Sequence, residues 1–184
     1  MVTTTAKLLR RQGYHATGLN QIVAEAEAPK GSIYFHFPGG KEQLAAEAIT
    51  ASADYIDRAL RTCERPTARE ALDEYIAKTA SLLERTKYAD GCPIATVVLE
   101  ASLTSDVLGK ACADAVELLL SRVASWLEAD GFSAAEARQR AQLVYAAIEG
   151  SMIFAKALRS TEPLTTLRGQ LPQLLARDGA EISG

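Results

Sequence analysis

The chain has 184 residues, of which 48 % are hydrophobic and 23 % charged, and its net charge is −3. This composition is that of an ordinary globular protein and excludes a disordered or fibrous chain. The three cysteines are scattered, the first residues lack the apolar core of a signal peptide, and no apolar run approaches the length of a membrane span, so we expect a cytoplasmic protein with no membrane partner.

The charge is unevenly distributed along the sequence. Residues 1–44 hold five basic and three acidic side chains, a net charge of +2, so the remaining residues carry −5. Contact with phosphates needs only local positive charge. The asymmetry is therefore consistent with an N-terminal part, here called the head, that faces an anion and is joined to an acidic C-terminal part.

Apolar residues recur at three- and four-residue intervals throughout, which predicts helices and no strand. Short helices are expected over residues 3–12, 19–26 and 29–37, with Gly13 ending the first and Pro29 starting the third. Long helices are expected over residues 41–63, 66–83, 94–101, 108–127, 133–159 and 163–174. Gly169 and Pro172 suggest that the last of these is bent or shortened.

The expected fold class is all-α, with a three-helix head joined to a larger helical domain. We place a helix-turn-helix DNA-binding domain at residues 1–46 and a ligand-binding and dimerisation domain at residues 47–184.

The second and third short helices are joined by a tight turn, Glu27-Ala28-Pro29, and this arrangement is typical of a helix-turn-helix. Ile33 is expected to pack inward, which turns the small and polar residues of the third helix outward. Lys30 can then donate to a guanine edge or a phosphate, and Gly31 lets the backbone approach the groove. Spacing alone leaves open an ordinary helical hairpin with a solvated face.

The sequence adds a dense resemblance over residues 6–46. The runs Gly13–Val23, Ala26–Phe37 and Lys41–Leu44 resemble the DNA-binding segment of the TetR/AcrR family, and Phe37–Leu44 resembles its LmrA-like branch. The resemblance implies a transcriptional regulator. It implies phosphate contacts from Thr17, Ser32, Tyr34, His36 and Lys41, and contacts near the bases from Asn20, Lys30 and Gly31.

Two carboxylates lie in otherwise apolar helical stretches, Glu100 after Ile94–Leu99 and Glu149 within Val144–Phe154. Such a carboxylate must reach water, find a partner or face a polar spot in a pocket, because isolated burial of its charge is costly. A solid core with a structural hydrogen bond is the alternative to a pocket. The candidate ligand-binding residues are Tyr75, Trp126, Tyr145, Glu149 and Met152. The LmrA-like resemblance implies an apolar, aromatic effector.

The opposite stripe of the helix over residues 133–159 has small residues in its middle, where another helix can come close. With the leucines of the last helix, it is expected to form a bundle of two helices per subunit across a two-fold axis, as the resemblance implies. The expected interface residues are Leu143, Ala147, Gly150, Ser151, Phe154, Leu158, Leu164, Leu167, Leu171 and Leu174.

The sequence therefore predicts a homodimeric repressor that binds double-stranded operator DNA and is released by a small apolar or aromatic effector. The alternative is a helical carrier or sequestering protein without specific DNA binding. The two histidines, His15 and His36, both fall in the head, and the sequence has no nucleophile elbow, metal-spaced ligand set or phosphate-binding glycine loop. We therefore expect no catalytic residue, metal or cofactor, with a Glu100–Glu149 carboxylate pair as the remaining enzymatic option.

Overall fold

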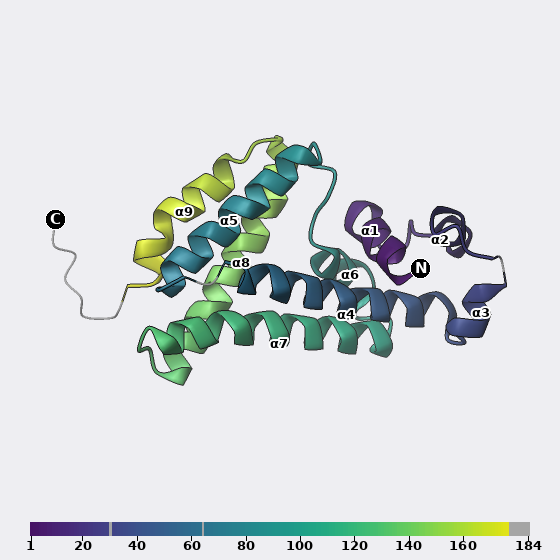
Figure 1. The fold of residues 1–184 in the computed structure, drawn as a ribbon, viewed down its shortest axis with the longest axis horizontal. Coiled ribbons are helices and arrows are strands. Elements are labelled where there is room, and N and C mark those ends of the chain that lie inside the picture. The colour runs from purple at the N-terminus through teal and green to yellow at the C-terminus, as the bar shows by residue number, and fades with distance from the viewer. Residues whose placement is uncertain (30, 64, 177–184) are drawn as a thin grey trace. The chain divides into compact units, whose positions relative to one another are not determined.

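The structure is a computed structural model and describes residues 1–29, 31–63 and 65–176 (Figure 1). All regular elements in these residues are helices, which confirms the all-α prediction. The helices are α1 (Val2–Gln12), α2 (Leu19–Glu25), α3 (Ser32–His36), α4 (Gly40–Arg61), α5 (Ala68–Arg85), α6 (Pro93–Ala101), α7 (Asp106–Ala129), α8 (Ala134–Leu158) and α9 (Glu162–Leu174). Among the described residues, none of the helices is both long enough and apolar enough to cross a membrane.

The chain forms two compact units. The first contains residues 1–58 and 89–119, and the second contains residues 59–88 and the described residues from 120 onward. This division by packing differs from the functional boundary expected between residues 46 and 47, because α6 packs on α1 and joins the head in the first unit.

The head, residues 1–46, is closed by a small hydrophobic core. Its buried members are Leu8, Ile22, Phe37 and Leu44. Gly13 ends α1 with φ +82°, a conformation that side-chain-bearing residues rarely adopt, and its N–H bonds to the Leu9 carbonyl at 3.0 Å. The chain can therefore turn sharply from α1 towards α2.

The third helix is shorter than expected. It begins at Ser32 and not at Pro29, because the Pro29 carbonyl accepts the Ser32 N–H at 2.9 Å in a separate turn before the helix. Ile33 is buried as predicted, so the remaining side chains of this short helix are turned away from the head core.

The second unit is built from α5, α8 and α9 together with the end of α7, and Figure 1 shows the first three side by side. α8 begins with a capping box, in which Ser133 and Glu136 each bond to the other's backbone N–H. α9 packs on both α5 and α8, and Arg168 forms two hydrogen bonds with Asp73 at 2.8 and 2.7 Å. α9 contains Pro172, whose nitrogen has no proton to donate to the carbonyl four residues earlier, and the helix ends two residues later at Leu174.

Candidate nucleic-acid interface and effector region

α3 presents aromatic and polar side chains to solvent. Tyr34 is 68 % exposed and Phe35 is 83 % exposed, and His36 is exposed beside them. The rings of Phe35 and His36 pack edge to face with their centroids 5.0 Å apart. Such large rings are seldom left open to water without a partner, so this surface is suited to contact another molecule.

Phe35 is absent from the DNA-contact residues implied by the resemblance. The exposure of Phe35 follows from helix geometry. Ile33 and Phe37 both face the core, so a residue midway between them in a short helix must point away. The methyl group of thymine is exposed in the major groove, and an exposed phenyl ring can make an apolar contact with it.

Two of the expected contact residues have hydroxyl groups that are already used within the head, and a third is not described. Thr17 needs correction, because its side chain is 1 % exposed and its hydroxyl donates to the Gly13 carbonyl at 2.6 Å inside the head. Ser32 donates its hydroxyl proton to the Pro29 carbonyl at 2.6 Å, so its donor is already engaged. Lys30 lies outside the described residues.

Asn20 and Gly31 both lie at the surface of the head. Gly31 has an ordinary φ of −87°, and a Cβ atom added to it would meet nothing within 4 Å. The fold itself therefore gives no reason for glycine at this position, whereas close approach of a partner does.

Lys41 lies in the first turn of α4, with its ammonium group 4.3 Å from the centroid of the Tyr14 ring. Burial lowers the pKa of Lys41, and the Glu100 carboxylate opposes that change. Burial also raises the pKa of Tyr14, with a smaller contribution from Glu42. The ring thus holds Lys41 at the start of α4, where its charge adds to the positive end of the helix dipole.

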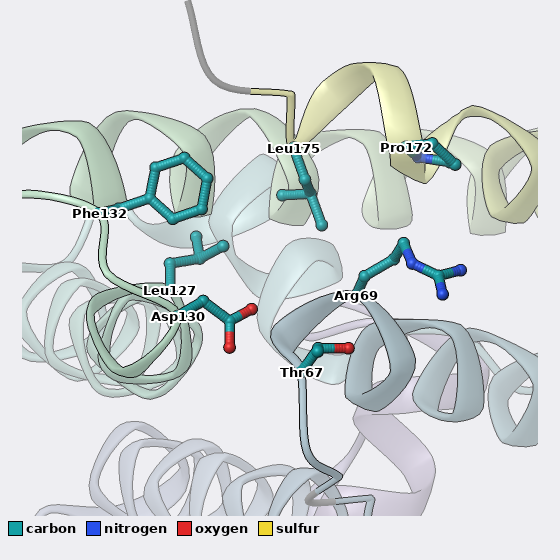
Figure 2. A pocket seen from close by; sticks show the side chains of 7 residues that line it. All are labelled: Thr67, Arg69, Leu127, Asp130, Phe132, Pro172 and Leu175. Atoms are coloured by element: carbon teal, nitrogen blue, oxygen red, sulfur yellow. The ribbon is translucent and has the colours of Figure 1, made fainter. Parts of the chain in front are cut away.

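The expected effector residues all belong to the second unit, but the structure does not bring them into either pocket described there. Trp126 and Tyr145 are buried, and Tyr75, Glu149 and Met152 are half-buried. The first pocket, of about 330 Å³, is lined by Thr67, Arg69, Leu127, Asp130, Phe132, Pro172 and Leu175 (Figure 2). In Figure 2, Leu127, Phe132 and Leu175 point toward one another and give this pocket an apolar end.

The expected dimer residues divide between the two helices. On α8, Leu143, Phe154 and Leu158 are exposed, Phe154 by 62 %, and Ala147, Gly150 and Ser151 are half-buried. Ile153, which the prediction did not include, is also exposed. A groove of about 440 Å³ between α8 and α9 is lined by Ser151, Phe154, Leu158, Glu162, Pro163, Thr166, Leu167 and Gln170.

On α9 the prediction needs correction. Leu164, Leu167 and Leu171 are buried within their own unit, where α9 packs on α5 and α8, and Leu174 is half-buried. One apolar face is enough to dock a helix onto its own subunit, so these leucines are used there. Leu167 also reaches the groove between the two helices.

Glu100 belongs to the first unit, whereas the expected ligand-binding residues belong to the second. Its carboxylate accepts the backbone N–H of His15 at 2.8 Å, within the turn between α1 and α2. Glu149 belongs to the second unit, so the two carboxylates occur in different units.

Comparison with known proteins agrees with this architecture. Residues 2–48 match the family described as bacterial regulatory proteins of the tetR family, and residues 68–170 match the C-terminal domain of LmrA/YxaF-like transcriptional regulators. The HTH-type transcriptional regulator LmrA of Bacillus subtilis (strain 168) is 34 % identical over 179 residues, covering 96 % of this chain and 95 % of that protein. The uncharacterized regulator YxaF of the same organism is 36 % identical over 178 residues, covering 96 % and 93 % of the two chains.

Solved structures show the same fold. A TetR transcriptional regulator from Legionella pneumophila superposes with a TM-score of 0.82 at 19 % identity, covering 94 % of this chain and 93 % of the other. The reduced form of Escherichia coli NemR gives a TM-score of 0.79 at 24 % identity, with 97 % of each chain covered. From its two family matches and its full-length relatives, the chain belongs to the TetR family of helix-turn-helix transcriptional regulators, with a C-terminal domain of the LmrA/YxaF-like type.

Proposed function

We propose that this protein is a repressor that binds operator DNA as a homodimer and leaves it when a small apolar, aromatic effector binds. The observation that carries the proposal is the exposed surface of α3, where Tyr34, Phe35 and His36 face solvent within a segment of the TetR family type. An α-helix of this kind fits the major groove of B-DNA.

In this proposal the head divides its contacts between the DNA backbone and the bases. Tyr34, His36 and Lys41 bind phosphates and fix the register of α3, as their exposure and the Tyr14-supported position of Lys41 allow. Asn20, Lys30 and Gly31 approach the base edges. Phe35 joins them as an apolar contact to a thymine methyl group.

Dimerisation is proposed to use the exposed side of α8, because the leucines of α9 are buried in their own unit. The exposed apolar side of α8 includes Leu143, Phe154 and Leu158, with Gly150 between them. Small residues in the middle of such a face let a second helix approach closely. Paired across a two-fold axis, the two recognition helices would enter successive major grooves about 34–36 Å apart.

The effector is proposed to bind in the second unit, close to the buried rings of Trp126 and Tyr145. A ligand that binds better to a dimer with wider-spaced heads shifts the population away from the DNA-bound state. Repression needs no contact with polymerase, since an operator-bound dimer blocks access by itself.

The test is a gel shift with the promoter beside the protein's own gene, repeated at several salt concentrations. A sequence-dependent shift that weakens with salt and is lost in Tyr34→Ala supports the proposal. A shift that is equal for promoter and random DNA contradicts it. A carrier protein would bind the effector normally and show no promoter preference.

Effector binding can be followed directly, because Trp126 is the sole tryptophan of the sequence. A panel of planar aromatic compounds is titrated while tryptophan emission is recorded, with Trp126→Phe as the blank. A compound that quenches the emission and releases the promoter supports the effector proposal. Loss of affinity in Tyr145→Ala but not in Phe132→Ala would assign binding to the predicted residues; the reverse would assign it to the pocket of Figure 2.

A further inference from the structure

Glu100, at the end of α6, is bonded twice to the turn between α1 and α2. Its Oε2 atom accepts the His15 backbone N–H at 2.8 Å, and its backbone oxygen lies 3.2 Å from His15 Nε2. Both contacts join residues 85 positions apart in sequence. A hydrogen bond from a backbone N–H to a carboxylate is stronger than one between neutral groups.

The turn is shaped around this carboxylate. A Cβ atom added to Gly13 would overlap the Glu100 side chain, and the φ of +82° at Gly13 is itself suited to glycine. Gly13 also accepts the hydroxyl proton of the buried Thr17 on its carbonyl oxygen at 2.6 Å. One short turn therefore contacts the Glu100 carboxylate through the His15 N–H and the Thr17 hydroxyl through the Gly13 carbonyl.

A second contact secures the same helix end. Asp90, which is buried, lies 3.2 Å from Arg10 Nε and 2.9 Å from Arg11 Nε in the last turn of α1. The segment from Asp90 to Glu100 thus contacts α1 and its following turn at both of its ends. The Lys41 ammonium group, over the Tyr14 ring of this turn, also interacts with the Glu100 charge.

We propose that Glu100 is a positioning residue for operator binding, whose carboxylate fixes the α1–α2 turn and thereby the orientation of α2 and of Lys41 in the head. Glu100 touches no DNA in this proposal. It acts through His15, Gly13 and the residues that follow them, and the inference rests on the proposed DNA-binding function.

The test compares Glu100→Gln with Glu100→Ala, which remove the same charge but differ in the hydrogen-bond acceptor. Glu100→Gln keeps an oxygen for the His15 N–H and is expected to bind operator at least as tightly as the wild type. Glu100→Ala is expected to bind operator about tenfold more weakly than Glu100→Gln, with equal affinity for random DNA, because non-specific binding depends on charge and not on precise orientation.

Hydrogen exchange without DNA gives a second readout. The His15 amide and its neighbours are expected to exchange faster in Glu100→Ala than in Glu100→Gln. The thermal unfolding midpoints of the two variants are expected to be equal. Gly13→Ala should weaken operator binding in the wild type by more than in the Glu100→Ala background, because the overlap with the carboxylate is removed there.

Equal operator affinity and equal exchange in Glu100→Gln and Glu100→Ala would overturn the positioning role while leaving the proposed function intact. A wild-type protein that shows no promoter preference would overturn both. The paired glutamine and alanine variants keep the test valid even where Gly13→Ala fails to fold.

Discussion

The surfaces of α3 and α8 both expose large hydrophobic side chains, but of different chemistry. α3 offers rings with polar groups beside them, Tyr34, Phe35 and His36, with the Lys41 ammonium on the next helix. The exposed face of α8 is aliphatic and phenyl, with Leu143, Ile153, Phe154 and Leu158. Polar-tipped rings suit a wet and charged partner, whereas an apolar stripe with small residues suits another helix. On the proposed function, the kind of exposed hydrophobic residue therefore distinguishes the proposed DNA-binding face of α3 from the proposed subunit face of α8.

The largest expected effect comes from charging the α8 stripe. Phe154→Glu combined with Leu158→Glu should give monomers in sedimentation analysis and weaken operator binding by about 100-fold or more, because the two heads no longer bind as one unit. Ser125→Glu, an exposed position on α7, is the matched control and should leave the dimer unchanged. A doubly charged variant that stays dimeric would remove α8 from the proposed interface.

A cavity made in the head and one made in the second unit should show whether the two parts of the molecule unfold independently. Leu44→Ala in the head and Leu72→Ala in the second unit each remove a fully buried side chain, and each should lower the free energy of unfolding by about 2–5 kcal/mol. Urea denaturation measures the loss. Hydrogen exchange should accelerate in α1–α3 for Leu44→Ala alone; acceleration of the head in Leu72→Ala as well would show that the two regions do not open independently.

Substitutions on α3 should affect binding with little effect on stability. Phe35→Ala is expected to weaken the operator complex by about 1–3 kcal/mol, because it removes an apolar base contact. The loss should depend on the base pair at one operator position. Tyr34→Phe should weaken operator and random DNA alike, because it removes a phosphate contact. Fluorescence anisotropy with a set of single-base operator variants distinguishes the two patterns, and a uniform loss in Phe35→Ala would contradict base contact.

The smallest expected effect concerns the ion pair between α5 and α9. The hydrogen bond from Arg168 lowers the pKa of Asp73, so this pair stabilises the fold above the unfolded pKa of an aspartate and loses that contribution as the pH falls through the lower folded pKa. Asp73→Asn should cost less than about 1 kcal/mol at pH 7, since the pair is partly exposed, and nothing once the wild-type carboxyl is protonated. Urea denaturation at pH 7 and at a pH below the folded pKa of Asp73 measures the change in unfolding free energy. Asp114→Asn, which removes the exposed pair with Lys110, is the control.

The positions of the helices could be predicted from sequence because their start and stop signals are local. The stop at Gly13 and the capping box of Ser133 and Glu136 each act within a few residues. The start of α3 was misplaced by three residues, since Pro29 takes part in a preceding turn that periodicity does not reveal.

The partners of each helix face could not be predicted in the same way. A periodic apolar face indicates that something covers it, but the leucines of α9 are covered by their own subunit and those of α8 are exposed. For Glu100 the sequence leaves water, a partner or a pocket open, and the structure shows a partner, the His15 amide, which is far away in sequence. Thr17 likewise matches a DNA-contact motif while its hydroxyl is used inside the head.

The pairing of Arg10 and Arg11 with Asp90 has a consequence for how the protein searches a chromosome. These are two of the five basic side chains in residues 1–44, and the single Asp90 carboxylate offsets part of their charge within the protein. Less positive charge is then available to displace counterions from DNA of arbitrary sequence, so on the proposed function we expect weaker non-specific binding. The same Asp90 that secures the end of α1 would then also limit the share of the protein held at sites other than its operator.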